Sequence, residues 1–230
     1  MVFIDTRRMP VRATQFAPDE HYHICVRGNN KQDIFNNDSD RARLLFLLLH
    51  LQSPETIFNT RRAAGSYLTH RIWNIDETLR ARIIETRYVA LEALAFMTNH
   101  FHLALREVEE GGTVRYMQRV LNAYAKYFNT KYEMVGHLFQ GPYRAVHIGS
   151  NDQLLYTSAY LHRNPRELPG VAGREHTYEW STYSDYLGPN RFGDLLDTSL
   201  VLEQFESLAD YRVFVDSSIA KDDAYLFDPF

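Results

Sequence analysis

The chain has 230 residues, 45% of them hydrophobic, so it is long enough to bury a core in one large domain. Its single cysteine, Cys25, excludes disulfides within the chain and cysteine-rich zinc sites. The net charge of −4 is unevenly distributed, because residues 171–230 hold 4 Lys/Arg against 12 Asp/Glu, whereas residues 1–170 hold 21 basic and 17 acidic residues. The larger part is mildly basic, which permits a nucleic-acid partner.

The N-terminal residues contain no long apolar run. We therefore expect neither a signal peptide nor a membrane span, and we expect a cytoplasmic protein.

The first third of the chain predicts one strand, two helices and an irregular segment. Residues 21–28 alternate and stop at a Gly-Asn-Asn turn, which predicts a strand. Residues 38–52 predict a helix, with Asp38 or Ser39 as its cap and Leu44, Leu45, Leu48 and Leu51 as its buried stripe. Residues 53–75 contain Pro54 and Gly65 and read as an irregular insertion or a mobile loop. Residues 76–87 predict a short helix.

The rest of the chain predicts a hairpin, a long helix, a strand and a capped helix. Residues 88–97 and 100–106 read as antiparallel strands joined at Thr98-Asn99. A long helix is predicted over 113–132 and a strand over 143–148. Ser150, with Gln153 three residues later, predicts a capping box for a helix that ends before Pro165. Another helix is expected near 198–209.

The order β-α-β-β-α-β predicts an α+β fold, the ferredoxin-like split βαβ arrangement. We expect one antiparallel sheet with the crossover helices on one face, an added helix after the last strand, and a C-terminal extension. The expected domains are a catalytic domain over 1–170, with the insertion at about 53–75, and an acidic extension over 171–230 that packs on it.

Two histidines stand one residue apart in a predicted strand, in the stretch His100-Phe101-His102. Alternate residues of a strand point to the same side, so the two imidazoles share one face of the sheet. Two neutral imidazoles so placed can bind one divalent cation. The alternative is a pair of core histidines, each hydrogen-bonded to the backbone.

The helix over 150–165 carries Tyr156, Tyr160 and Asn164 at intervals of four residues, hence on one face. Asn164 offers a neutral oxygen suited to Mg²⁺ or Mn²⁺, and a tyrosine hydroxyl beside such a metal can attack a phosphate. The alternative is an ordinary amphipathic helix with buried tyrosines.

Several stretches, in order, resemble the REP-associated tyrosine transposases, which are insertion-sequence-like single-tyrosine transposases with a His-hydrophobic-His ("HUH") motif. The stretches are YHICVRGNN (22–30), AFMTNHFHLAL (95–105), GHLFQGPYRAVHI (136–148), YLHRNPREL (160–168) and YEWSTYSDYLG (178–188). The resemblance covers about residues 20–190. Thr98 and Pro142 depart from the family pattern, in the turn before the histidines and at a position where a basic residue is common.

The resemblance implies an enzyme that nicks, transfers and rejoins single-stranded DNA beside hairpins, that is, a DNA transposase with endonuclease activity. Tyr160 matches the family nucleophile, which forms a 5′-phosphotyrosine. His100, His102 and Asn164 match the ligands of a divalent metal, Mg²⁺ or Mn²⁺. Tyr156 matches no family signature and is kept as a back-up nucleophile. The implied setting is a bacterial cytoplasm, at the nucleoid, and a homodimer is possible.

Phosphate and base contacts are expected from polar residues near the proposed site and on the long helix. Arg115, Arg119 and Lys126 fall near one azimuth of that helix, for which a solvated face is an equally good interpretation. The candidates for DNA binding are Arg27, Asn29, Asn30, Arg115, Arg119, Arg144, His147, Arg163 and Arg166.

Two rival functions stay open at this level. The first is a protein derived from a transposase that binds DNA hairpins without cutting them. The second is a ferredoxin-like metal-binding or hydrolytic protein with no nucleic-acid role.

Overall fold

The computed structural model describes residues 14–56 and 58–218, and its centre is one four-stranded antiparallel sheet. The strands are β1 (His21–Arg27), β2 (Val89–Phe96), β3 (His100–Glu107) and β4 (Arg144–Ile148), in the spatial order β2-β3-β1-β4. Every neighbouring pair is antiparallel. The predicted ferredoxin-like, α+β fold is therefore confirmed.

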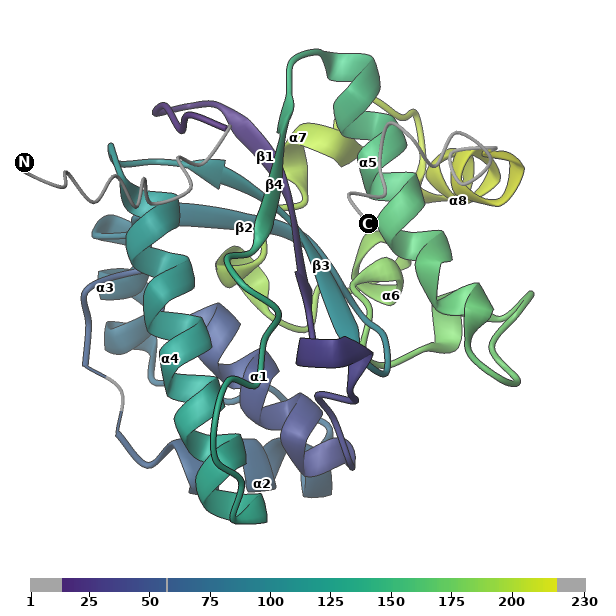
Figure 1. The fold of residues 1–230 in the computed structure, drawn as a ribbon. Helices are drawn as coiled ribbons and strands as arrows, with labels where there is room; N and C mark the ends of the chain where they lie inside the picture. Colours follow the sequence, from purple (N-terminus) through teal and green to yellow (C-terminus); the bar gives the residue numbers. More distant parts are fainter. Residues whose placement is uncertain (1–13, 57, 219–230) are drawn as a thin grey trace, which may run out of the picture.

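Helices cover both faces of the sheet (Figure 1). One side carries α1 (Asp38–His50), α2 (Thr60–His70), α3 (Glu77–Glu85) and α4 (Gly112–Tyr132). The other carries α5 (Asn151–Arg163), α6 (Tyr183–Leu187) and α8 (Leu208–Ser217). The shorter elements are η1 (Asn29–Lys31), η2 (Asn164–Glu167), η3 (Glu175–Thr177), η4 (Gly193–Leu195) and α7 (Ser199–Leu202).

Strand alternation gives the two faces of the sheet different chemistry. Tyr22, Ile24, Phe101 and Leu103 belong to the main hydrophobic core, which β1 and β3 share with α1 and α4. In the register of these strands, Cys25 pairs with His102, and Arg27 pairs with His100. His100, His102 and Ala104 share the face opposite this core, which we call the histidine face, and Ala104 is buried against Tyr160, so this face is turned toward α5.

Local sequence signals set several element boundaries. Met97, Thr98 and Asn99 join β2 to β3, and the turn includes the predicted Thr98-Asn99. The carboxylate of Glu107 accepts hydrogen bonds from the backbone N–H groups of Gly111 and Thr113, so the end of β3 caps the start of α4. Ser150 Oγ accepts from Gln153 N at 3.3 Å, which is the predicted cap of α5.

The prediction of an irregular segment over 53–75 is wrong, because α2 forms within it. Ala64 and Tyr67 lie three residues apart and bury one side of α2, which packs against α1. Gly65 is exposed, where glycine costs a helix only about 1 kcal/mol. Packing against α1 outweighs that cost.

Two further helix predictions need correction. The cap of α1 is Asn37, which forms a capping box with Asp40, in place of Asp38 or Ser39. The helix expected near 198–209 is divided into α7 and α8, because Ser207 caps a new helix.

The C-terminal segment, 171–218, packs on the sheet and on α5. Phe96 N donates to Trp180 O at 2.9 Å and Thr182 N to Leu94 O at 3.1 Å, so residues 180–182 run along the edge of β2. Tyr183, Tyr186 and Tyr211 form a second apolar cluster with residues of α5. Residues 219–230 of the predicted extension and 1–13 of the predicted catalytic domain lie outside the described residues.

No helix within residues 14–56 and 58–218 is long and apolar enough to cross a bilayer.

Burial lowers the pKa values of three histidines in the described part of the chain, His23, His50 and His162. His162 of α5 contacts the Tyr211 hydroxyl through Nδ1 at 2.6 Å and the Thr182 hydroxyl through Nε2 at 3.0 Å. Burial lowers the pKa of His162 to about 3, and it lowers the pKa values of His23 and His50 to about 4. The folded protein therefore resists protonation of all three rings.

We predict that acid destabilises the fold well above the usual carboxylate range. Below pH of about 6.5 the unfolded chain takes up protons that the folded chain does not, so the free energy of unfolding falls by about 1.4 kcal/mol per pH unit for each histidine. Urea unfolding at pH 7, 6 and 5 measures this loss. An unfolding free energy that stays constant over this range would contradict it.

Candidate functional site

Tyr160 lies directly on the histidine face of the sheet. Its ring centroid is 5.5 Å from that of His102 and 5.6 Å from that of His23, in both cases edge to face. Ala93 and Ala104 are buried against Tyr160, and their small side chains let α5 approach the sheet closely. The tyrosine is only 3% exposed.

The two histidines of β3 are neighbours, and a different group holds the Nδ1 atom of each. Their ring centroids are 5.0 Å apart, with the planes nearly perpendicular. The His102 Nδ1 atom lies 2.9 Å from His23 Nε2, and the His100 Nδ1 atom lies 2.7 Å from Asn99 Oδ1. The Nε2 atom of His102 lies 3.9 Å from Cys25 Sγ. Because Nδ1 of each ring has these partners, Nε2 is the nitrogen that would bind a metal ion, and at His102 the ion would replace the contact with Cys25 Sγ.

Asn164 supplies a buried oxygen atom without a partner. It begins η2, one helical turn beyond Tyr160, and η2 contacts β2. Its Oδ1 is buried and accepts no hydrogen bond in the described structure. A buried carbonyl oxygen left in this state costs about 1–3 kcal/mol, and a cation would satisfy it.

The donor set suits a cation held by two imidazoles and one amide. Within the described ranges no group of three or more His, Cys, Asp or Glu side chains is arranged to hold a metal ion. The donor set that the sequence predicts is the Asn164 amide with His100 and His102, which are neutral oxygen and nitrogen donors able to bind a divalent cation.

Sequence reasoning missed His23, the ring behind His102. The signal was present, because His21-Tyr22-His23 repeats the His-x-His spacing on the neighbouring strand. His21 instead contacts the buried carboxylate of Glu92 at 2.9 Å. Burial lowers the pKa of His23 to about 4, so its imidazole is neutral beside His102 at pH 7.

Six of the nine residues predicted to bind DNA either lie on the histidine face or are close in sequence to a residue of the proposed site. Arg27 pairs with His100 and Arg144 with Cys25 across the sheet, so both belong to the histidine face. Asn29 and Asn30 form the η1 turn after Arg27. Arg163 and Arg166 flank Asn164, where Arg163 donates to Val215 O at 3.4 Å and Arg166 lies 4.0 Å from the Glu175 carboxylate.

The other three predicted DNA-binding residues are not brought to the site. Arg115 and Arg119 lie on α4, across the sheet. Arg115 pairs with Glu109, and Arg119 donates to the carbonyl oxygens of Ser53 and Glu55. His147 pairs with Tyr22 across the sheet, so it lies on the face opposite the histidine face, and it contacts the Glu20 carboxylate.

The predicted back-up nucleophile, Tyr156, faces a different layer. It is 42% exposed and its ring lies 5.7 Å from that of Phe214 on α8. Tyr160 is therefore the tyrosine of α5 that contacts the histidines.

Comparisons with known proteins agree with the predicted resemblance. The family model described as "Transposase IS200 like" matches residues 57–164. A solved structure described as "Structure of the REP associates tyrosine transposase bound to a REP hairpin" aligns with a TM-score of 0.50 at 12% identity, and covers 84% of this chain and 96% of that chain. No curated protein matches the chain.

At 12% identity the solved structure supports only the fold. The family model supports the resemblance to IS200-like transposases over residues 57–164. The predicted resemblance to IS200-like transposases is therefore confirmed by the family model over residues 57–164, and the predicted fold is confirmed over most of the chain by the solved structure.

Proposed function

We propose that the protein is a DNA transposase that cleaves and rejoins single-stranded, hairpin-associated DNA through Tyr160. The observation that carries the proposal is the contact of the Tyr160 ring with His102 on the histidine face. The match of residues 57–164 to IS200-like transposases supports a DNA-processing enzyme.

In the proposed reaction, the Tyr160 hydroxyl oxygen bonds to a backbone phosphorus atom while the bond from phosphorus to the 3′ oxygen breaks. The products are a 5′-phosphotyrosine and a 3′-hydroxyl, so the phenol proton ends, in net terms, on the 3′ oxygen. No water is consumed. Attack by another 3′-hydroxyl reverses the step and rejoins the strand.

The proposal gives the neighbouring residues separate roles. His100, His102 and Asn164 would hold Mg²⁺ or Mn²⁺, which supplies positive charge for the scissile phosphate. Arg27 and Arg144, on the same face of the sheet, would contact flanking phosphates. His23 would orient His102 through the 2.9 Å hydrogen bond.

The partner proposed is single-stranded DNA that carries a hairpin. The solved structure with a similar fold holds a REP hairpin, which supports this choice. A homodimer and an activity at the nucleoid belong to the same proposal. Light scattering of the chain with and without hairpin DNA measures the oligomeric state.

A second candidate function is hairpin binding without cleavage, and one observation favours it. Tyr160 is 3% exposed, so a phosphate can reach its hydroxyl only after the side chain or its surroundings move. A protein that only binds DNA would need no such movement.

We predict that incubation with hairpin-bearing single-stranded DNA and Mn²⁺ yields a covalent adduct that Tyr160→Phe abolishes. Denaturing gels of radiolabelled DNA measure the adduct. Tyr156→Phe is the matched control and should retain it, because Tyr156 faces α8. DNA binding without any adduct would favour the binding protein, and an adduct that survives Tyr160→Phe would refute the role of Tyr160.

We predict that Asn164→Leu removes Mn²⁺ binding without loss of stability. Leucine fills a similar volume and eliminates a buried oxygen that has no hydrogen bond, so the melting temperature should hold or rise. Calorimetric titration with Mn²⁺ and thermal unfolding are the two measurements. Unchanged Mn²⁺ affinity would exclude Asn164 as a ligand.

We predict that His23→Ala weakens Mn²⁺ binding by about 10- to 100-fold, the usual effect of losing the group that orients a metal-binding histidine. His23→Gln should restore part of the affinity, because its amide can still contact His102 Nδ1. If His23 only fills space, alanine and glutamine should leave the Mn²⁺ affinity equally unchanged.

A further inference from the structure

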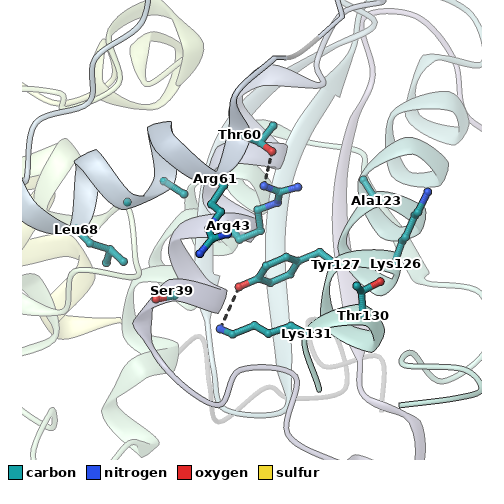
Figure 2. Close-up of a pocket in the computed structure, with 12 residues that line it drawn as sticks. Ser39, Arg43, Thr60, Arg61, Leu68, Ala123, Lys126, Tyr127, Thr130 and Lys131 are labelled. Atoms are coloured by element: carbon teal, nitrogen blue, oxygen red, sulfur yellow. Dashed lines mark hydrogen bonds between the residues drawn. The ribbon is translucent and has the colours of Figure 1, made fainter. Parts of the chain in front are cut away.

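A cavity of about 930 Å³ lies between α1, α2 and α4, on the side of the sheet away from Tyr160 (Figure 2). This volume is within the range of about 300–1,000 Å³ that is common for ligand pockets. Nothing in the proposed cleavage site uses it. The residues that line it are Ser39 and Arg43 of α1, Thr60, Arg61, Ala64, Gly65 and Leu68 of α2, and Ala123, Lys126, Tyr127, Thr130 and Lys131 of α4.

The cavity is basic. Arg43, Arg61, Lys126 and Lys131 line it, and none of the described lining residues is acidic. Figure 2 shows that these cationic side chains come from all three helices. Walls that carry one sign of charge concentrate the electric field and attract counter-ions, here anions.

Three of these four cations have no carboxylate partner within the described residues. Lys131 is the exception, because it contacts the buried carboxylate of Asp40 at 2.6 Å. Arg43 donates to the Thr60 hydroxyl and lies 5.0 Å from the centre of the Tyr127 ring, while its Nε is buried without a hydrogen bond. Arg61 and Lys126 are exposed. The unmatched charge is a reason for the cavity to bind an anion.

We propose that this cavity, which we call the helical-face cavity, binds the phosphate backbone of DNA. Phosphate groups match both the cations and the hydroxyls of Ser39, Thr60 and Thr130, the side-chain types that contact DNA phosphates.

A DNA backbone fits this cavity better than a free nucleotide does. A nucleotide site needs a surface on which the base can stack, and Tyr127 is the one aromatic ring among the described lining residues. Arg43 already lies over that ring. The cavity therefore offers charge for phosphates and no open platform for a base.

The inference rests on the proposed function and adds a second DNA contact to it. The sheet separates the helical-face cavity from Tyr160, so the DNA held there is a flanking or separate segment. Because its contacts are with phosphates, this binding is independent of base sequence and weakens steeply with salt.

The test is a paired substitution of exposed cations in the full chain. The double variant Arg61→Ala with Lys126→Ala removes two cations of the cavity. The matched control is Arg62→Ala, because Arg62 is an exposed arginine next to Arg61 that does not line the cavity. Fluorescence anisotropy measures the Kd of a fluorescent duplex DNA at several salt concentrations. Thermal unfolding confirms that each variant is folded.

We expect the double variant to bind duplex DNA about tenfold or more weakly and to lower the slope of log Kd against log salt by about 2, since each phosphate contact contributes about 0.9. Arg62→Ala should change neither. Equal slopes in the double variant and the control would overturn the inference. A second result would also overturn the inference: the unsubstituted protein binds inorganic pyrophosphate tightly, and the double variant loses this binding but binds DNA unchanged. The cavity would then serve a small ligand.

The Tyr160 adduct assay, run on the same variants with a short single strand, separates the two proposals. An adduct with an unchanged slope overturns the helical-face cavity alone. A changed slope with no adduct in the unsubstituted protein overturns cleavage alone.

Discussion

The close approach of α5 to the sheet is the constraint on which the rest of the site depends. Tyr160 can contact His102 and His23 only because Ala93 and Ala104, paired across β2 and β3, leave room above the strands. Larger side chains at these two positions would lift the helix from the sheet and separate the phenol from the imidazoles. The catalytic geometry that we propose is therefore set by two residues that have no chemistry of their own.

The C-terminal segment holds α5 from the opposite side. His162 lies two residues beyond Tyr160, which turns its ring away from the sheet, toward Tyr211 and Thr182. Thr182 in turn donates its backbone N–H to Leu94 of β2. The rotation of α5 is therefore fixed by a chain of hydrogen bonds that runs from Tyr211 of α8 through His162 and Thr182 to Leu94 of the sheet. The segment after residue 170 stabilises the site although it contributes none of the proposed ligands.

The sequence was sufficient to predict the sheet, because alternation, turn residues and caps are local signals. His100-Phe101-His102 shows the same logic, since a strand must place both rings on one face. Helix α2 could not be predicted in this way. Its stability comes from Ala64 and Tyr67 packing against α1, and such a contact is not visible in a segment that also contains Pro54 and Gly65.

The residues predicted for the site also divide into those that the structure brings to the histidine face and those that it places elsewhere. Residues fixed by strand register or helix spacing, such as Arg27 and Tyr160, lie on or against the histidine face. Arg119 was predicted to bind DNA because it shares one azimuth of α4 with Arg115 and Lys126, but it instead donates to the backbone carbonyls of Ser53 and Glu55 after α1. His147 follows Arg144 by three residues in a strand, and this odd spacing places the two side chains on opposite faces. Periodicity within one element thus predicts which side chains share a face, but not whether that face lies at the site.

Two polar atoms at the interface between α5 and the sheet lower the stability of the fold. Asn164 Oδ1 and His23 Nδ1 are both buried without a hydrogen bond, and each such atom costs about 1–3 kcal/mol. On the opposite face of the same strands, Ile24, Phe101 and Leu103 pack with α1 and α4 without polar side-chain atoms to satisfy. Proteins tolerate such unsatisfied groups mainly where function requires them. The two unsatisfied atoms beside Tyr160 and His102 support the proposal that the histidine face carries the chemistry of this protein, and this support does not depend on any resemblance.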